Sequence, residues 1–312
     1  MDAGVINNRI KVETEHTEQG VFWKEIIKKG LPYLMIAPTM AVSLVFLVYP
    51  ILYMIKLGFY KWNMVGEMKF IGLDNYRALM TDPEFLQVLK NTCQFSFWTV
   101  AGCMILGMMF ALYLNKNARF EQLVQEIMFT PYVLPMISIA FIWMWIMDGD
   151  IGLLNYILGF FGIEKVRWLD DPDVAMYSLI LVNIWKGVGY YTLIILSALQ
   201  SIPKYIYEAA ELDQAHPVTT FFRLTLPMLS PTLFFLSITA VISSFKVFET
   251  VNVMTAGGPQ NSTTSLVYYI YQYGFQFYKI GYASAAGVIL MVIVGAFTLV
   301  YFGCLQKKVH YQ

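Results

Sequence analysis

Six separate stretches of this chain are each long and apolar enough to cross a lipid bilayer. They cover residues 31–55, 92–114, 127–147, 174–199, 228–248 and 284–305. A helix needs about 20 mostly apolar residues to span the hydrocarbon core of a membrane, and inside lipid a chain can satisfy its backbone hydrogen bonds only as a helix or a closed barrel. The sequence therefore predicts an all-α membrane protein with six transmembrane helices.

The composition agrees with this class. The chain is 58% hydrophobic and 13% charged, with a mean hydropathy of +0.57. Lys+Arg and Asp+Glu both number 21, so no excess of positive charge indicates nucleic acid, and the expected surroundings are a lipid bilayer. We expect one membrane domain over residues 31–305, between tails at 1–30 and 306–312. Residues 21–29 in the first tail predict either an interfacial helix or a solvated lead-in.

Basic residues beside the spans indicate the orientation. Lys28 and Lys29 precede the first span directly, and Lys307 and Lys308 follow the last one. Positive charges next to spans favour the cytoplasmic side. Both termini are therefore expected in the cytoplasm, which also places the segment between the fourth and fifth spans inside the cell.

Sequence motifs of catalysis are missing from this chain. It contains no phosphate-binding G-x-x-x-x-G-K-[ST], no G-x-S-x-G and no H-E-x-x-H. Its three cysteines and three histidines show no spacing typical of a metal site. We expect that the protein is not an enzyme, and that any uphill transport takes its energy from another chain or from an ion gradient.

The segment EAAELDQAHPVTTFFRLTLP, from Glu208 to Pro227, is too polar for lipid but is not typical of a flexible connector. Its Ala- and Glu-rich first half favours a helix, and Pro203 suits the start of that helix. A short helix held in the loop 200–227 between two spans is well placed to dock a partner at the membrane face.

Residues of this segment resemble the cytoplasmic EAA loop of binding-protein-dependent ABC importer permeases. The match consists of Glu208-Ala209-Ala210, then Asp213, then Leu226-Pro227. The family has a glycine after the acidic residue, where this chain has Gln214. Because a glycine would bend the loop there and the residue before a proline is biased away from helix, we expect the bend to move to His216-Pro217.

Two further stretches are similar to carbohydrate permeases, in particular to the first permease subunit of maltose-, lactose- and glycerol-phosphate-type systems. One runs over residues 254–263, 268–271 and 281–285, and the other over residues 59–60 and 70–76. Together with the EAA loop, the resemblance covers residues 31–305. It implies a type I permease core whose path carries a sugar, such as an oligosaccharide or sugar derivative, across the bacterial inner membrane.

The resemblance also implies the partners. These are a second permease subunit, expected to be a different chain, two ATPase subunits that use ATP and Mg, and an extracellular sugar-binding protein. This chain itself is expected to bind no cofactor. Glu208 is expected in the first turn of the short helix, where the helix dipole favours a carboxylate. The residues expected to contact the ATPase are Glu208, Ala209, Ala210, Asp213, Gln214, Leu226 and Pro227.

A substrate path needs polar and aromatic side chains inside the fourth and fifth spans. The resemblance to maltose-type permeases assigns Lys186, Gly187 and Tyr190 to it, and the residues expected to line the path are Asn183, Lys186, Gly187, Tyr190, Tyr191, Ala240, Ser243, Ser244 and Val247. Ser244 and Val247 stand where the family has asparagines, which indicates a different sugar or a weaker site.

Two lysines, Lys186 and Lys246, lie within the expected spans. A lysine within a span costs at least about 2.5–3.5 kcal/mol on insertion scales, so Lys186 is a functional candidate. It is either a donor to substrate hydroxyls, a gate charge, or part of a buried ion pair. Lys246 is expected to form an exposed pair with Glu249 one helical turn away, which contributes little.

Other function classes remain open at this point. An ion-coupled carrier or channel would need no ATPase, and a membrane anchor or sensor would transport nothing. The interiors of the expected spans hold no Asp or Glu, which argues against proton coupling.

Overall fold

The computed structural model describes residues 31–116 and 119–305, so the expected tails at 1–30 and 306–312 lie outside the described residues. Contacts divide the chain into two units, one up to Lys56 and one from Leu57 onward. In the first unit, one helix begins at Leu31, passes through the π-helical segment η1 (Leu44–Val48), and continues as α2 (Tyr49–Leu57). Its large apolar side chains are exposed almost throughout, as suits a helix surrounded by lipid.

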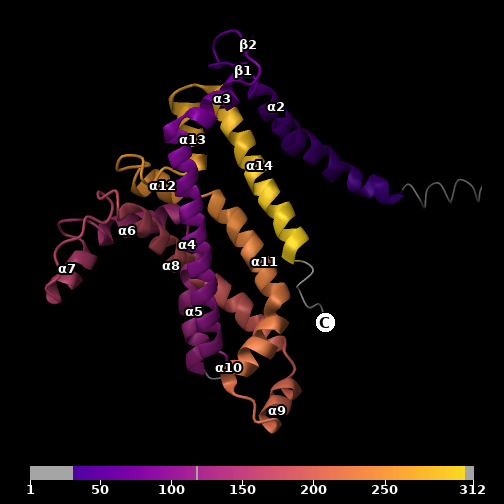
Figure 1. Ribbon diagram of the computed structural model, residues 1–312, viewed down its shortest axis with the longest axis vertical. Helices are drawn as coiled ribbons and strands as arrows, with labels where there is room; N and C mark the ends of the chain where they lie inside the picture. Colours follow the sequence, from indigo (N-terminus) through magenta and orange to yellow (C-terminus); the bar gives the residue numbers. More distant parts are fainter. Residues whose placement is uncertain (1–30, 117–118, 306–312) are drawn as a thin grey trace, which may run out of the picture. The chain divides into compact units, whose positions relative to one another are not determined.

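In the described part of the second unit the regular structure is helical apart from one small antiparallel hairpin, β1 (Tyr60–Lys61) paired with β2 (Lys69–Phe70) (Figure 1). The remaining elements are α3 (Asp74–Thr81), α4 (Pro83–Tyr113), α5 (Arg119–Val133), α6 (Met136–Ile146), α7 (Leu153–Phe160), α8 (Ala175–Ser201), α9 (Lys204–Leu212), α10 (Pro217–Thr220), η2 (Phe221–Thr225), α11 (Leu226–Phe245), α12 (Glu249–Met254), α13 (Leu266–Tyr271), η3 (Gln272–Gln276) and α14 (Ile280–Leu305). We refer to the two ends of this unit as the hairpin end and the α9 end.

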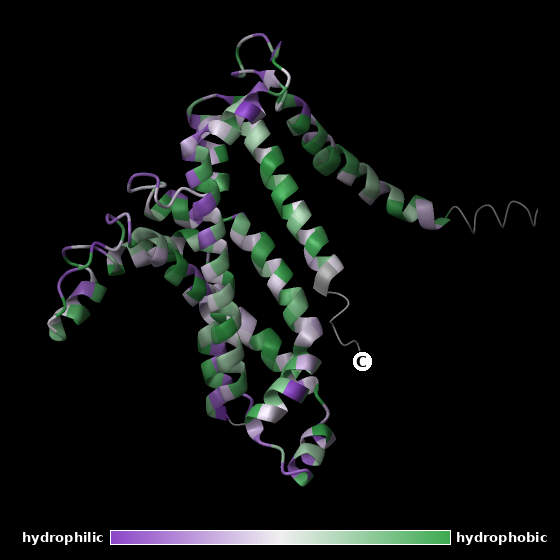
Figure 2. Cartoon of the chain, viewed as in Figure 1, coloured by the Kyte–Doolittle hydropathy of each residue, from purple (hydrophilic) through white to green (hydrophobic). Residues whose placement is uncertain are grey.

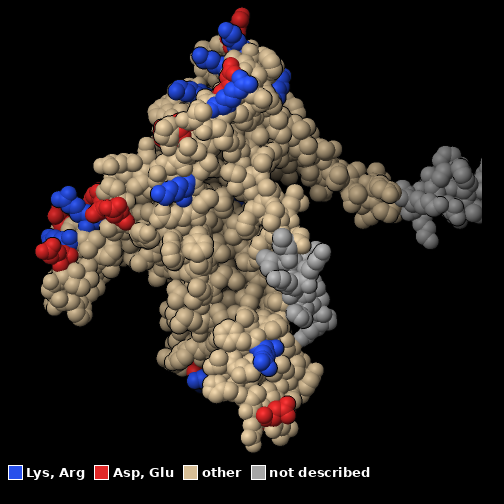
Figure 3. Space-filling view, in the orientation of Figure 1, with Lys and Arg blue, Asp and Glu red and all other residues tan. Residues whose placement is uncertain are grey.

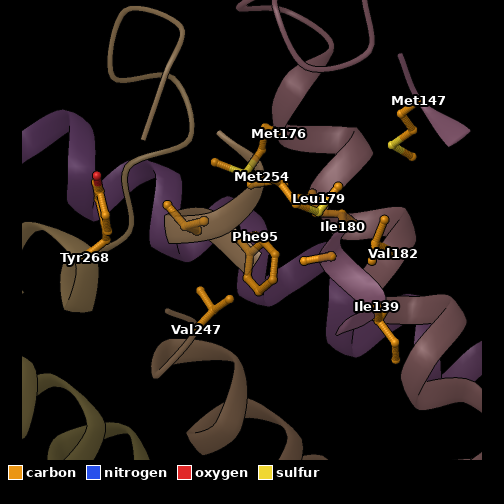
Figure 4. Packing of buried hydrophobic residues seen from close by; sticks show 12 residues of the cluster. Phe95, Ile139, Met147, Met176, Leu179, Ile180, Val182, Val247, Met254 and Tyr268 are labelled. Atoms are coloured by element: carbon orange, nitrogen blue, oxygen red, sulfur yellow. The ribbon is translucent and has the colours of Figure 1, made fainter. Parts of the chain in front are cut away.

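Helices α4 and α8 form the centre of the second unit and share its most extensive contact, while α5 packs on α8 and α11 packs on α4. The largest buried cluster brings Phe95 of α4 against side chains of α6, α8 and α12 (Figure 4). A second cluster joins α3 and α4 to α13 and α14, and a third joins α8 to α11 toward the α9 end. Buried apolar contacts therefore fix α4 against α8 and α11, and α8 and α11 carry all the predicted path residues except Val247, which follows α11.

Within residues 31–116 and 119–305, five helices are each long and apolar enough to cross a membrane: Leu31–Leu57, Pro83–Tyr113, Ala175–Ser201, Pro217–Met254 and Ile280–Gly303. The pair α5 and α6 passes the same test together, which gives up to six spans. The prediction of a helical membrane protein is therefore confirmed, while the third span differs from the expected straight helix over 127–147. Its two helices meet at a bend of 102°, with Pro131 inside α5 and Pro135 before α6. Proline cannot donate a backbone hydrogen bond, which favours a break at such a position.

Apolar and charged residues occupy different parts of the molecule. Green, apolar residues cover the long helices (Figure 2), and on the face shown in Figure 3 the charged side chains gather mainly at the hairpin end, on the loop around α7 and at the α9 end. Between them lies a largely uncharged surface. This arrangement is typical of a protein that crosses a bilayer, because charged side chains are costly within the hydrocarbon core.

Candidate functional site

A cavity of 340 Å³ lies where α8 faces α4, the end of α5, and the junction of α11 with α12. Phe95 and Val247 belong to the largest buried cluster and form part of its wall (Figure 4). The residues that line the cavity are Phe95, Thr99, Val100, Cys103, Tyr132, Met136, Asn183, Lys186, Gly187, Tyr190, Tyr191, Thr239, Ala240, Ser243, Ser244, Lys246, Val247, Glu249 and Thr250.

All nine residues that the sequence predicted for the substrate path line this one cavity. On α8 the sequence spacing explains why these side chains meet at the cavity: Asn183, Lys186 and Tyr190 lie three and four residues apart, so they share one face of the helix. On α11 the small residues Ala240 and Ser244 are also four apart and are both buried against neighbours. The structure thus brings the predicted set together, and its role in transport stays a prediction.

Aromatic rings and hydrogen-bonding groups share the walls of the cavity. Tyr132 and Tyr190 stack with ring centroids 4.5 Å apart and planes 11° from parallel, and the Tyr191 ring meets that of Tyr190 edge-on. Asn183 donates to the Thr250 hydroxyl at 3.2 Å and to its own helix at the Leu179 carbonyl. Flat apolar faces beside hydroxyl and amide groups can bind the two sides of a sugar ring.

Among the described residues Lys186 has no ion-pair partner, and its ammonium bonds to backbone carbonyls. Its Nζ donates to the backbone carbonyls of Pro131 at 3.1 Å, Tyr132 at 2.8 Å and Leu134 at 2.7 Å. A helix end leaves its last carbonyls without partners, and each unsatisfied backbone group in lipid costs several kcal/mol. These three hydrogen bonds therefore offset both the cost of the helix break and the cost of inserting the lysine. The buried ion pair, one of the alternatives expected for Lys186, is wrong.

Lys246 and Glu249 do not form the expected pair on one helix. Helix α11 ends at Phe245, with Lys246 as its C-cap, and α12 begins only at Glu249. No ion pair between the two is found within the described part of the chain. Instead both side chains line the cavity, so they belong to the candidate site, although the sequence did not predict this.

Tyr132 was also missed by the sequence analysis. Its signal was present in the two prolines around it, Pro131 and Pro135, because prolines inside an apolar span predict a break that lines a protein cavity rather than lipid. Among residues 31–116 and 119–305, no group of three or more His, Cys, Asp or Glu side chains is placed to hold a metal ion.

At the α9 end, the short helix expected between the fourth and fifth spans is α9, which begins after Pro203 as expected. The expected place of Glu208 in its first turn is wrong: α9 begins at Lys204, so Glu208 lies in the second turn and the helix dipole gives it no special stabilisation. Glu208 and Ala209 are exposed, but Ala210 is buried against its own chain. Of the EAA triplet, two residues are therefore accessible to a partner.

Gln214 itself makes the bend that was expected at His216-Pro217, so that expectation is wrong. Its φ is 53°, in the left-handed region. The amide of Ala215 donates to the Ala210 carbonyl at 2.9 Å, and the amide of Gln214 donates to the Glu211 carbonyl at 3.0 Å. These two bonds form a Schellman motif, in which the left-handed residue is usually glycine. Gln214 therefore takes the left-handed position at the end of α9 that is usually occupied by glycine.

Asp213 and Gln214 are exposed at the end of α9, whereas Leu226 and Pro227 lie elsewhere. The helix of the fifth span already begins at Pro217, so Leu226 and Pro227 are half-buried within it, at the start of α11. The Tyr207 hydroxyl on α9 contacts the Thr225 hydroxyl at 3.2 Å and joins the two helices there. Leu226 and Pro227 therefore lie in the helix of the fifth span and not on the exposed end of α9, and their contact with the ATPase stays a prediction.

The chain matches known protein families over most of its length. Residues 104–311 match the family described as binding-protein-dependent transport system inner membrane component. The sn-glycerol-3-phosphate transport system permease protein of Pectobacterium atrosepticum is 33% identical over 290 residues, which is 90% of this chain and 96% of the relative. The trehalose/maltose transport system permease protein of Thermococcus litoralis is 34% identical over 272 residues, 87% of this chain and 92% of the relative. The sulfoquinovosyl glycerol transport system permease protein of Agrobacterium fabrum is 30% identical over 301 residues, 96% of this chain and 98% of the relative.

A solved structure agrees with these relatives. A chain of a bacterial alginate ABC transporter, in complex with an alginate pentasaccharide-bound periplasmic protein, superposes with a TM-score of 0.81 at 26% identity. The match covers 92% of this chain and 98% of the other. The expected type I permease core is confirmed by this likeness, and the relatives are membrane subunits of transporters rather than catalytic subunits.

Proposed function

This chain belongs to the family of binding-protein-dependent transport system inner membrane components, and from that premise we propose that it carries a sugar or sugar derivative through the cavity beside α8. The observation that carries the proposal is the convergence of the nine path residues on one cavity with stacked tyrosines and hydrogen-bonding groups. An ion-coupled carrier or channel, the alternative function, is less well supported, because this family works with a separate binding protein.

The partners follow from the same premise. A second permease subunit completes the path, two ATPase subunits bind below it and use ATP with Mg, and an extracellular binding protein delivers the sugar. The cargo class is supported by the names of the relatives, which transport glycerol 3-phosphate, sulfoquinovosyl glycerol or trehalose and maltose. In this proposal the present chain needs no cofactor of its own.

The α9 end is proposed to face the cytoplasm, with both termini on that side, and to receive the ATPase. Exposed side chains support this role for Glu208, Ala209, Asp213 and Gln214. Leu212, 85% exposed at the end of the same helix, and Tyr205, 68% exposed at its start, give α9 an apolar surface that a partner would cover. ATP-driven movement of the ATPases would reach the cavity through α8 and α11, which continue on either side of α9.

The path is tested by uptake in proteoliposomes that hold the complete transporter and its binding protein. Labelled sn-glycerol 3-phosphate, maltose and an alginate oligosaccharide serve as probes. We expect Tyr190→Ala to lower uptake of the transported probe at least tenfold, while Tyr156→Ala, on the exposed face of α7, does not. Unchanged uptake of every probe by the Tyr190→Ala transporter would refute the path.

The coupling role is tested separately by co-purification with the ATPase. Glu208→Lys reverses an exposed charge on α9 and is expected to reduce both assembly and sugar-stimulated ATP hydrolysis. Glu164→Lys reverses an exposed charge in the loop after α7 and is the control. Full assembly and full stimulated hydrolysis in the Glu208→Lys complex would contradict the assignment of α9.

A further inference from the structure

The end of α5 is an irregular piece of backbone beside the cavity. Pro131 lies inside α5, Pro135 precedes α6, and the chain turns by 102° between the two helices. A helix end leaves carbonyls without intrahelical partners, and at membrane depth irregular backbone is stable only where protein or a cavity satisfies it. The break therefore requires a donor from elsewhere in the chain.

Lys186 of α8 is that donor, and the task occupies all of its hydrogen-bonding capacity. An ammonium group has three N–H donors and no acceptor. The three carbonyls of Pro131, Tyr132 and Leu134 lie 2.7–3.1 Å from Nζ, one for each donor. No donor remains for a substrate hydroxyl, although the side chain borders the cavity.

The same contacts fix the position of an aromatic wall. Lys186 holds the backbone of Tyr132 and also lies 5.5 Å from the centre of its ring. Tyr190 is one helical turn further along α8 and stacks on that ring at 4.5 Å. One face of α8 therefore holds the main chain of Tyr132 through Lys186 and its side chain through Tyr190.

Gly189 of α8 lets α5 approach closely enough for Lys186 to reach the carbonyls at the end of α5. A Cβ added at Gly189 would collide with the Met128 carbonyl and the Phe129 Cα of α5. Any other residue at position 189 would push α5 away from α8, and so would move the carbonyls away from Lys186.

We propose that Lys186 is a positioning residue: it caps the broken third span and so holds the Tyr132 ring against Tyr190 as one wall of the substrate cavity. Lys186 acts on the substrate through Tyr132 rather than by direct contact. The proposal rests on the proposed function in that the cavity is taken as the sugar path, but the capping itself does not depend on it.

Lys246 offers a matched control. It is a second lysine on the cavity lining, it is exposed, and within the described ranges no hydrogen bond or ion pair engages its ammonium group. Its ammonium has the same charge and reach as that of Lys186 but holds no backbone. The two lysines therefore separate the effect of a positive charge in the cavity from the effect of the cap.

The first experiment needs no substrate. Hydrogen–deuterium exchange of the complete transporter is followed in peptides that cover residues 126–138. Lys186→Met is expected to speed exchange there at least tenfold, whereas Lys186→Arg, which keeps the donors, and Lys246→Met leave it unchanged. Exchange unaltered in the Lys186→Met transporter overturns the cap.

The second experiment is a double-mutant cycle on the KM of uptake, with labelled sn-glycerol 3-phosphate or maltose, whichever the wild type transports. Lys186→Met is expected to raise KM about tenfold in the wild-type background and less than twofold in a Tyr132→Leu background, because its effect passes through Tyr132. The effects of Lys246→Met and Tyr132→Leu are expected to multiply. If those of Lys186→Met and Tyr132→Leu multiply as well, Lys186 contacts the substrate directly and the proposal is wrong.

Two outcomes keep this test separate from the test of the path. If Tyr132→Leu and Tyr190→Ala both leave uptake unchanged, the cavity is not the sugar path, and the exchange experiment alone decides whether Lys186 caps α5. If the Lys186→Met transporter does not assemble, Lys186→Gln, which retains two amide donors without a charge, takes its place in both experiments. The cap then predicts faster exchange than wild type in residues 126–138 and a KM between those of wild type and of Tyr132→Leu. A charge acting on the substrate predicts wild-type exchange and a full loss of uptake.

Discussion

Asp82 ties three helices together at the hairpin end, so its removal is expected to destabilise the protein far more than removal of a surface acid. Its Oδ1 accepts the Glu84 amide at 3.0 Å and caps α4. Its Oδ2 accepts the hydroxyls of Tyr282 at 3.0 Å and Tyr269 at 3.2 Å, which come from α14 and α13. We therefore expect Asp82→Ala to loosen the contact of α4 with both helices.

The magnitude follows from these three bonds. Each phenol bond to the carboxylate contributes about 1.5 kcal/mol, the low end for a charged partner because Asp82 is only half-buried, and the N-cap contributes about 1 kcal/mol. The hydroxyls of Tyr269 and Tyr282 also lie 3.1 Å apart, so without the carboxylate one of them can donate to the other, which returns about 1 kcal/mol. The net loss is about 3 kcal/mol, or a fall of about 6 °C in the unfolding midpoint at about 2 °C per kcal/mol.

The matched control is Asp74→Ala, also at the hairpin end. Asp74 pairs with Arg77 at 3.6 Å, but the two side chains are 66% and 78% exposed, so their pair contributes less than about 1 kcal/mol. The assay is thermal unfolding of the detergent-purified transporter, followed by tryptophan fluorescence. A midpoint for Asp82→Ala no lower than that for Asp74→Ala would show that the two phenol bonds add no stability, and the reasoning would be refuted.

Three further predictions concern backbone and titration. Gly189→Ala should abolish stable expression, because its Cβ would collide with the Met128 carbonyl; Gly159→Ala on α7, where nothing lies within 4 Å, should be tolerated. Gln214→Gly should raise stability by about 0.5–1 kcal/mol, since glycine adopts a left-handed φ without strain, measured as a higher unfolding midpoint. Burial raises the pKa of the Tyr269 phenol above its ordinary 10.0. The stability that the phenol contributes is therefore complete below pH 10 and is lost as pH rises through the folded-state pKa, and Tyr269→Phe should reduce that alkaline loss of stability.

Each of these has a result that contradicts it. Normal yield of the Gly189→Ala protein would mean that α5 and α8 are further apart than described. An unchanged or lower midpoint for Gln214→Gly would show that the left-handed turn carries no strain. An alkaline unfolding profile of Tyr269→Phe identical to wild type would exclude this phenol as its source.

The helices and the cavity could be predicted from the sequence for different physical reasons. Spans such as Ala175–Ser201 follow from length and hydropathy, because a membrane leaves the backbone few alternatives. The convergence of Asn183, Lys186 and Tyr190 follows from helical spacing on α8. The resemblance to a family then indicated which face of which span mattered.

What the sequence did not predict lies where helices break. The pairing expected for Lys246 with Glu249 assumed a continuous helix, but α11 ends at Phe245 and α12 begins only at Glu249, so the spacing rule no longer applies. The bonds of Lys186 could not be inferred from side chains, because its partners are carbonyls, which every residue carries. The fold alone decides which carbonyls lack an amide donor, and in this chain they are the carbonyls of Pro131, Tyr132 and Leu134.

The irregular features of the site explain one another. A proline inside a span, a lysine at membrane depth, and a non-substitutable glycine would each be unfavourable alone. Together, Gly189 lets α5 approach α8, the break at Pro131 exposes carbonyls, and Lys186 satisfies them while its own charge is stabilised by those dipoles. Each cost is offset by a neighbour, which requires that the three residues act as a unit. Their effects on stability should therefore be strongly non-additive. Lys186 without the break would be an uncompensated charge at membrane depth, and the break without Lys186 would leave an open helix end.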